Sequence, residues 1–198
     1  MCGRYILFSD KEMAEIREII REAEENSKLH VKDGEICPTD IAPVLLPVGD
    51  GMAAYAMSWG FPRHDGKGVV FNARSESVAD KPMFRDALQK RRCLIPSAGF
   101  FEWKSEGKKK IKYHFTLPDH PLLFMAGIYN HYGNAPEEKQ NCFSILTTDA
   151  NQWVNDIHSR MPVVLRESEY AEWLRGPADL AALFDRNGVI LNKTISSP

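Results

Sequence analysis

Short segments typical of β-strands recur along most of this 198-residue chain, and they constrain the fold more than any other feature. Each segment is apolar or alternates apolar with polar residues, and turn-forming residues separate it from the next. Residues 112–117 alternate with the period of two that a half-buried strand requires, after a hairpin turn expected at residues 105–108. The expected strands are residues 4–8, 52–59, 69–71, 94–103 with interruptions at Pro96 and Gly99, 111–117, 122–129, 142–147 and 162–165.

Helical patterns are fewer. Ser9 and Glu12 form a capping-box pattern, and apolar residues, the first of them Met13, follow at helical spacing to about Glu25. Further helices are expected at residues 75–90, 168–174 and 178–184, and neither a repeat nor a low-complexity linker divides the chain. We therefore expect one α+β domain over residues 1–198, in which helices flank a curved, barrel-like sheet of mixed or antiparallel strands.

Composition excludes several classes of protein. Hydrophobic residues make up 43% of the chain and charged residues 26%, which rules out a fibrous or largely disordered chain. The four cysteines form no Cys-x-x-Cys pair, and no His-x-x-His motif occurs, so we expect neither a metal nor a cofactor. No secretion signal and no apolar run of membrane-spanning length occurs, so we expect a cytoplasmic protein with reduced thiols.

The formal net charge of −2 averages two regions of opposite sign. Residues 1–40 carry six Lys and Arg against ten acids, whereas residues 85–112 carry nine against three, a net of +6. The basic region could face nucleic-acid phosphates. The cluster Lys108–Lys110 fits a solvated hairpin tip equally well, so both roles stay open for it.

Cys2 has the most distinctive chemistry in the chain. Removal of Met1 would leave an α-amine and a thiol on adjacent carbons, a pair that no internal residue offers. An α-amine has an ordinary pKa of about 7.7–8.0, so a usable fraction is neutral near pH 7, and a thiolate is a strong nucleophile. An aldehyde would form an imine with the amine, and the thiol would then close a five-membered thiazolidine ring. The alternative is an ordinary buried cysteine near a terminus.

Three further positions could carry acid–base or binding chemistry. Asn72 lies at the exit of a strand-like segment, where both a functional site and simple turn chemistry fit. Glu102 lies between two aromatic residues; burial would raise its carboxyl pKa and suit it to general acid–base catalysis, whereas period two equally allows it to face solvent. His158 lies in a dense polar run and could carry protons near neutral pH, while the other histidines are expected to be structural.

Eight short motifs carry a resemblance to a known family. They are Met1-Cys2-Gly3-Arg4-Tyr5, Trp59-Gly60-Phe61-Pro62, Asn72-Ala73-Arg74-Ser75-Glu76, Cys93-Leu94-Ile95-Pro96, Gly99-Phe100-Phe101-Glu102-Trp103, Ala126-Gly127-Ile128-Tyr129, Leu146-Thr147-Thr148 and Ile157-His158-Ser159-Arg160-Met161-Pro162. Each motif alone is weak evidence. In this order, over residues 1 to about 175, they closely resemble the SRAP proteins (the SOS-response-associated peptidase family, also called abasic-site processing proteins).

The resemblance implies an activity on damaged DNA. SRAP proteins sense abasic sites in single-stranded DNA and crosslink to them through an N-terminal cysteine, which protects the lesion. The resemblance also implies self-catalysed, peptidase-like removal of Met1 and an associated lyase activity. We therefore expect single-stranded DNA with abasic sites as the partner. We further expect a monomer in the cytoplasm or on the nucleoid, without a membrane partner.

Carried over residue by residue, the resemblance implies four catalytic residues. Cys2 supplies the amine and the thiol, and Asn72 binds the opened sugar or positions the amine. Glu102 shuttles protons, and His158 assists opening of the sugar ring and release of the crosslink. The implied DNA contacts are Arg4, Arg74 and Arg160 to phosphates, Trp59 stacked on a base, Pro38 as a wedge beside the DNA, and Thr147.

Some positions depart from the family pattern. Glu35 stands where Asn is common, which removes any contact that depends on that Asn, while Pro38 is kept. Ser159 stands where Asp is common, which removes a negative charge beside Arg160. Smaller changes are Cys37 in place of Ala and Phe61 in place of an aliphatic residue.

Two other functions stay open at this point. An N-terminal-cysteine peptidase or amidohydrolase would use Cys2 as its nucleophile, with Asn72 near the oxyanion. A noncovalent module would bind single-stranded DNA without chemistry at Cys2.

Overall fold

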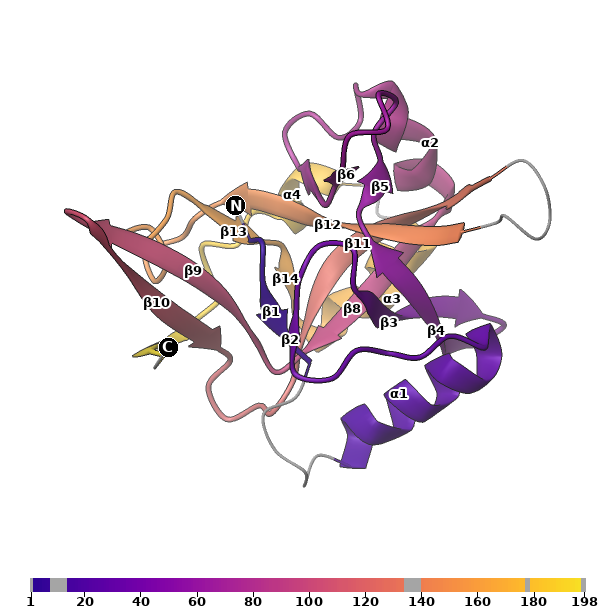
Figure 1. The fold of residues 1–198 in the computed structure, drawn as a ribbon, viewed down its shortest axis with the longest axis horizontal. Helices are drawn as coiled ribbons and strands as arrows, with labels where there is room; N and C mark the ends of the chain where they lie inside the picture. The colour runs from indigo at the N-terminus through magenta and orange to yellow at the C-terminus, as the bar shows by residue number, and fades with distance from the viewer. Residues whose placement is uncertain (1, 8–13, 134–139, 177–178, 197–198) are drawn as a thin grey trace.

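A closed barrel of five strands forms the centre of the protein (Figure 1). The computed structural model describes residues 2–7, 14–133, 140–176 and 179–196. Around the barrel β12 pairs with β4, β4 with β3, β3 with β8, β8 with β11, and β11 with β12 again. Of these five pairs only β12–β4 is parallel, so the barrel is mixed. The strands are β3 (Ile41–Val48), β4 (Gly51–Trp59), β8 (Arg92–Ser97), β11 (Leu123–Tyr132) and β12 (Gln140–Asp149).

Short strands extend the barrel at its edges. β7 (Asn72–Arg74) runs parallel to β12, and β13 (Arg160–Pro162) pairs with β12 in the antiparallel sense. β14 (Val164–Leu165) pairs with β11, while β5 (Phe61–Pro62) and β6 (Val69–Val70) form a separate two-stranded sheet. β7 and β13 thus both lie along the carboxyl half of β12, which brings residues far apart in the sequence together.

A second, antiparallel sheet has the strand order β15-β10-β9-β1-β2. Its strands are β1 (Tyr5–Ile6), β2 (Glu35–Ile36), β9 (Gly99–Glu106), β10 (Lys109–Thr116) and β15 (Asn192–Ile195). The β9–β10 hairpin extends to the left in Figure 1. Gly99 opens β9 with a φ of 152°, and a Cβ there would lie 2.6 Å from the carbonyl oxygen of Phe115. Only glycine permits so close an approach of the two strands.

Helices cover the barrel from outside. α1 (Ala14–Ser27) packs on β4 and β3 through one apolar face, and the side-chain amide of Asn26 donates to the carbonyl of Ala54 at 2.9 Å. α2 (Pro82–Lys90) contacts β11 and β8, and α3 (Glu167–Arg175) contacts β8 and β3. α4 (Leu180–Phe184) is a single short turn near the C-terminus. None of the described helices is long and apolar enough to cross a membrane.

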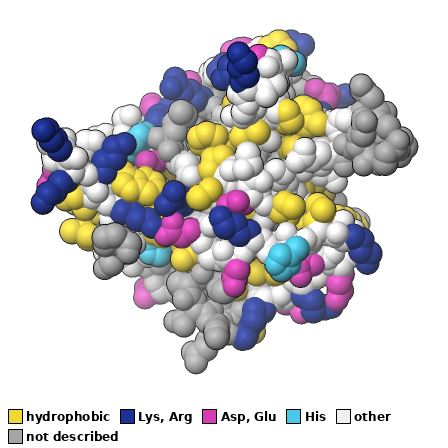
Figure 2. Space-filling view, viewed as in Figure 1, with side chains coloured by type: hydrophobic (Ala, Val, Ile, Leu, Met, Phe, Trp, Pro, Cys, Tyr) yellow, Lys and Arg dark blue, Asp and Glu magenta, His cyan; other side chains and the backbone are white. Residues whose placement is uncertain are grey.

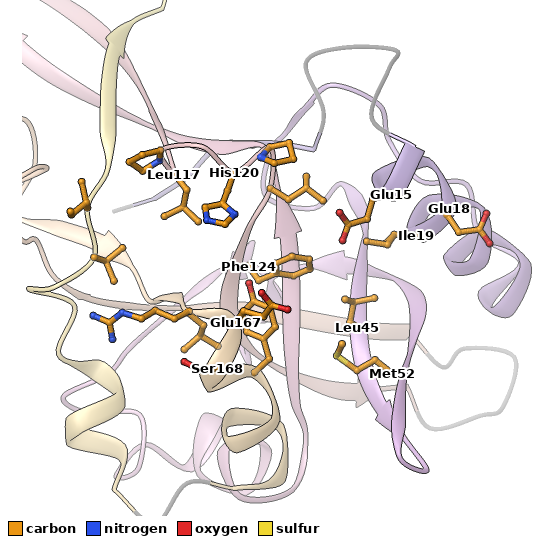
Figure 3. Close-up of a pocket in the computed structure, with 18 of the residues that line it drawn as sticks. Glu15, Glu18, Ile19, Leu45, Met52, Leu117, His120, Phe124, Glu167 and Ser168 are labelled. Carbon is orange, nitrogen blue, oxygen red and sulfur yellow. The ribbon is translucent and has the colours of Figure 1, made fainter.

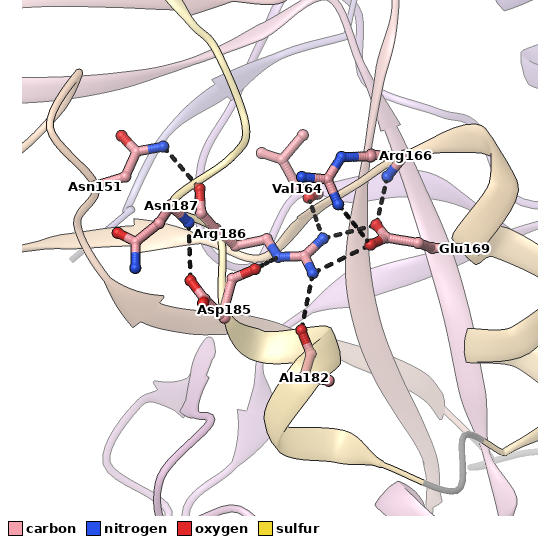
Figure 4. Close-up of polar contacts among 8 residues, drawn as sticks. All are labelled: Asn151, Val164, Arg166, Glu169, Ala182, Asp185, Arg186 and Asn187. Carbon is pink, nitrogen blue, oxygen red and sulfur yellow. Dashed lines mark hydrogen bonds and ion pairs between the residues drawn. The ribbon is translucent and has the colours of Figure 1, made fainter.

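A buried arginine fastens the C-terminal segment to the domain (Figure 4). The Arg186 guanidinium donates to Glu169 on α3 at 2.7 Å, and also to the carbonyls of Val164 and Ala182. The amide of Asn151 donates to the carbonyls of Arg186 and Val189 at 3.0 and 2.8 Å. These contacts tie the end of the chain to β14, α3 and α4.

The structure confirms the expected α+β class and the barrel-like sheet. The expected helix at residues 75–90 is shorter, because residues 75–80 form hydrogen-bonded turns and α2 begins at Pro82. Proline suits the first turn of a helix, where no N–H is needed, and disfavours helix before it. β3 was not expected, because Pro43 and Pro47 obscure its strand pattern. The capping residues Ser9, Glu12 and Met13 lie outside the described residues.

Candidate active site around Cys2

The four residues with candidate chemistry come together where the two sheets meet. Cys2 precedes β1, Glu102 lies on β9, Asn72 begins β7, and His158 stands two residues before β13. β1 and β9 are neighbours in the second sheet, whereas β7 and β13 both pair with β12 of the barrel. The topology therefore assembles a polar cluster from segments that the sequence separates by up to 156 positions.

Asn72 reaches the backbone of Cys2 directly. Its side-chain N–H donates to the Cys2 carbonyl oxygen at 2.8 Å, and the side chain is buried. Among the described residues, the Asn72 side-chain oxygen has no hydrogen-bond partner. Asn72 begins β7 rather than ending the preceding strand, and its pairing with Ile145 on β12 fixes its position. A buried amide oxygen without a partner is costly, so this atom is ready to accept a hydrogen bond at the site.

Glu102 and His158 form the titratable pair of the cluster. The Glu102 side chain is only 3% exposed, and its Oε1 lies 4.0 Å from Nδ1 of His158. Burial raises the pKa of Glu102 above the ordinary carboxyl value, and nearby positive charge opposes this only in part. The structure thus decides the open question about Glu102: its side chain is buried. A carboxyl with a raised pKa keeps its proton to a higher pH than an ordinary one, and it can therefore act as a general acid as well as a general base.

The backbone of Arg160 orients the His158 ring. Nδ1 of His158 lies 2.9 Å from the backbone nitrogen of Arg160 and 3.1 Å from its carbonyl oxygen, so this backbone holds the ring in place in either tautomer. The His158 side chain is 29% exposed, whereas Glu102 is buried. His158 therefore connects the buried carboxyl to solvent, as a group that exchanges protons must.

The Cys2 thiol is fully buried beside this pair. It donates to the carbonyl of Arg4 at 3.7 Å. Burial raises the pKa of the Cys2 thiol well above its ordinary value, and the negative charge of Glu102 raises it further. The group is therefore a neutral thiol at physiological pH, and it needs a base before it can act as a nucleophile.

A group of cations and aromatic rings lies on the second sheet next to the cluster. The Arg4 guanidinium lies 5.4 Å from the ring centre of Trp103, and Nζ of Lys112 lies 4.0 Å from that of Phe101. Both cations are ion-paired to Glu35. Lys and Arg side chains also crowd the left end of the molecule, at the tip of the β9–β10 hairpin (Figure 2).

Trp59 is a core residue, which corrects the expectation that it stacks on a DNA base. Its side chain is fully buried between Tyr5, Phe71 and Phe143, and its indole N–H donates to the carbonyl of Phe71 at 2.9 Å. No face of the ring is open to a ligand. The partly exposed Trp103 beside Arg4 is better placed for stacking, and sequence reasoning missed it because period two equally allowed its ring to pack inward.

Two further expected DNA contacts are buried in the structure. Arg160 is buried, and its guanidinium donates to Asp149 at 2.6 Å, to Glu76 at 2.8 Å and to the carbonyl of Thr147 at 2.8 Å. The Nε of Arg160 has no hydrogen-bond partner among the described residues. Thr147 is fully buried, and its hydroxyl has no hydrogen-bond partner among the described residues.

Three expected contacts are accessible, and Arg4, with 39% of its side chain exposed, is one of them. Arg74 is exposed at the end of β7. Pro38 is half-buried in a tight turn in which the N–H of Asp40 donates to the carbonyl of Cys37 at 3.0 Å. Thr39 in this turn has a φ of 80°, a conformation that β-branched residues rarely adopt. The turn therefore presents Pro38 from a rigid position.

A large cavity lies away from this cluster (Figure 3). It has a volume of about 1050 Å³, and α1, α3 and the segment between β10 and β11 line it. It contains none of the four clustered residues. Within the described part of the chain, no group of three or more His, Cys, Asp or Glu residues is placed to hold a metal ion.

Comparison with known proteins agrees with this geometry. A family model described as SOS response associated peptidase (SRAP) matches residues 1–193. The chain is 33% identical over 186 residues to the abasic site processing protein YoqW of Bacillus subtilis, which covers 88% of this chain and 80% of that protein. It is 37% identical over 121 residues to the abasic site processing protein YedK of Escherichia coli, with coverage of 59% and 53%.

Solved structures share the fold of this chain. A crystal structure of a protein from Bacteroides thetaiotaomicron superimposes with a TM-score of 0.79 and 25% sequence identity, covering 98% of this chain and 91% of the other. A structure from Bordetella bronchiseptica, 23% identical with a TM-score of 0.73, shares the fold over 100% of both chains. The match over residues 1–193, together with these relatives, shows that the chain belongs to the SOS response associated peptidase (SRAP) family.

Proposed function

We propose that this protein processes abasic sites in single-stranded DNA by forming a covalent crosslink through Cys2, after removal of Met1. The observation that carries the proposal is the contact between Asn72 and the Cys2 carbonyl, made beside the buried Glu102–His158 pair. Three functions therefore meet around Cys2: Asn72 positions it, Glu102 can hold a proton, and His158 can exchange one with solvent. The names of the relatives in Bacillus subtilis and Escherichia coli support abasic DNA as the substrate.

The reaction begins at the amine of Cys2. An abasic sugar equilibrates between a closed hemiacetal and an open aldehyde, and His158 is placed to move the proton that ring opening requires. The neutral amine adds to the aldehyde carbon to give a carbinolamine. Glu102 then donates a proton to the departing hydroxyl, so water leaves and the protonated imine forms. The raised pKa of Glu102 suits this step, because the carboxyl must carry a proton near neutral pH.

Ring closure follows at the thiol. The Cys2 sulfur adds to the carbon of the protonated imine, whose nitrogen keeps its proton, and a thiazolidine results. Glu102, which gave up a proton during loss of water, is the nearby base that accepts the thiol proton and so returns to its acid form. The raised pKa of the thiol favours this order, with the amine first and the sulfur second. Overall one water leaves and no proton is consumed.

The surface beside the cluster fits a single strand. Arg4 and Arg74 are accessible to phosphates, Trp103 offers an aromatic surface, and Pro38 acts as a wedge. Recognition through phosphates and stacking carries no sequence preference, which suits a lesion that lacks a base. The burial of Cys2 disfavours the alternative of an amidohydrolase, because a neutral thiol is a poor nucleophile toward an amide.

The test uses single-stranded DNA in which one deoxyuridine has been converted to an abasic site. We expect a heat-stable, slowly migrating band with the processed protein, and no band with Cys2→Ala or with DNA whose aldehyde has been reduced. Intact-mass analysis must show loss of Met1 from the reactive protein. Binding of intact strands without any crosslink would refute covalent capture, and turnover of small amides that depends on Cys2 would favour the peptidase.

A further inference from the structure

The surface next to the candidate site contains one carboxylate that bridges two cations. Glu35, on β2, accepts from the Arg4 guanidinium at 3.2 Å through Oε2 and from the Lys112 ammonium through Oε1. Burial alone would raise the pKa of Glu35, but the hydrogen bond from Lys112 and the nearby Arg4 outweigh it and hold this pKa below its ordinary value. Glu35 is therefore ionised at neutral pH, and it uses both oxygens to hold the two cations.

The register of the second sheet places this bridge on one face. β1 pairs with β2 and with β9, and β9 pairs with β10, so Arg4, Glu35 and Lys112 come from three neighbouring parts of the sheet. The two cations also lie over the rings of Trp103 and Phe101. The group is thus a cation–aromatic surface of the kind that binds single strands, with an anion placed at its centre.

We propose that Glu35 is a specificity-determining residue that weakens binding of undamaged single-stranded DNA. The inference rests on the proposed function, because Arg4 is expected to meet a phosphate there. A phosphate that approaches Arg4 or Lys112 must compete with the carboxylate for the same N–H groups. The Arg4 and Glu35 side chains are 39% and 35% exposed, so a phosphate can reach and displace the pair.

The consequence is that noncovalent binding of undamaged DNA and covalent capture of an abasic site depend on different residues. Noncovalent affinity stays low on an intact backbone, so the protein leaves undamaged strands quickly. An abasic site retains the protein through the covalent bond at Cys2, which Glu35 does not touch. A neutral residue at position 35 would free two cations and let the protein stay on undamaged DNA.

The variant Glu35→Gln tests this by keeping the side-chain shape and removing the charge. We expect affinity for an undamaged single strand, measured by fluorescence anisotropy, to rise about 3- to 10-fold at low salt. Each additional phosphate that a freed cation neutralises should steepen the slope of log affinity against log salt by ~0.7. The matched control is Glu106→Gln, which removes one exposed charge from β9 without touching the bridge, and should change affinity about twofold or less.

A second measurement separates the bridge from a general charge effect. In a Lys112→Met background, Glu35→Gln should raise affinity less than it does in the wild type, because one of the two freed cations is absent. Crosslinking to abasic DNA in an excess of undamaged strand should be slower for Glu35→Gln than for the wild type. Thermal unfolding of each variant verifies that it is folded.

The outcomes are distinct. Equal increases in affinity for Glu35→Gln and Glu106→Gln would overturn the inference, since only the bulk charge would matter. Weaker binding by Glu35→Gln would also overturn it, because Glu35 would then serve to position Arg4 and Lys112. A wild-type protein that binds single strands but forms no crosslink would refute the proposed function alone, since the anisotropy comparison does not depend on Cys2. Failure of both the wild type and Glu35→Gln to bind would overturn both.

Discussion

Replacing Glu102 by glutamine separates proton transfer by this side chain from its contribution to the fold. Gln keeps the size and polarity of the side chain but cannot donate and accept protons as a carboxyl does. Glu102 is 3% exposed, so bulk water cannot easily take its place beside Cys2. General acid–base catalysis contributes roughly 10²- to 10⁴-fold to a rate. We expect the crosslinking rate to fall about 10³-fold, which corresponds to ~4 kcal/mol in the activation barrier.

The same substitution has the opposite effect on stability. Burial raises the pKa of Glu102, so between the ordinary carboxyl pKa and the raised one the unfolded chain is ionised while the folded protein keeps its proton. This contribution to stability is fully present below the ordinary pKa and is lost as the pH rises through the raised pKa. Glu102→Gln has no such dependence. The variant should therefore unfold at or above the wild-type temperature at neutral pH.

The assay combines two measurements on the same preparations. Crosslink formation is followed by denaturing gels under single-turnover conditions, and unfolding by circular dichroism at acidic and neutral pH. Glu106→Gln on the same strand serves as the exposed control and should match the wild type in both. A normal crosslinking rate for Glu102→Gln would refute the proton-shuttle role. A rate loss accompanied by an equal loss of stability would show that Glu102 acts through the fold.

Four further substitutions test the places that the structure gives to individual side chains. Trp59→Ala should destabilise the fold by about 3–5 kcal/mol in urea titrations, because it removes a buried aromatic side chain. Trp103→Ala should instead weaken single-strand binding by about 1–3 kcal/mol, with little change in the free energy of unfolding. The reverse pattern would show that Trp59, not Trp103, is the stacking residue. Arg186→Met should cost about 1–3 kcal/mol in thermal unfolding, because the carbonyls of Val164 and Ala182 lose the guanidinium while Glu169 keeps Arg166, and wild-type stability would contradict this anchoring role. Gly99→Ala should cost at least ~1–3 kcal/mol, because its Cβ meets the Phe115 carbonyl, and wild-type stability would refute the close strand contact.

Local patterns account for the parts of the fold that were predicted. The strands around residues 52–59 and 111–117 and the helix ending near residue 25 show clear periods in the sequence, and the structure has β4, β10 and α1 there. β3 escaped prediction because Pro43 and Pro47 interrupt its pattern, and a barrel strand tolerates them only where its partners leave their nitrogen atoms free. The predicted helix begins at residue 75, whereas α2 begins at Pro82, because the residues that form turns at 75–80 also suit a helix.

For the candidate site, too, some features were predictable from the sequence and others depended on the tertiary structure. By itself the sequence determined which reactive groups are present. These are Cys2, which can become an aminothiol, the amide of Asn72, the carboxyl of Glu102 and the imidazole of His158, each in a recognisable motif. Only the tertiary structure decided which of them are buried and what they contact. Period two distinguishes the two faces of β9, but not which face the barrel covers, so Glu102 could not be assigned beforehand. Arg160 is paired with Glu76, 84 positions earlier, and such long-range contacts leave no trace in local composition. Burial and ion pairing depend on how distant segments pack, and that packing removed Trp59 from the surface and placed Glu35 between two cations.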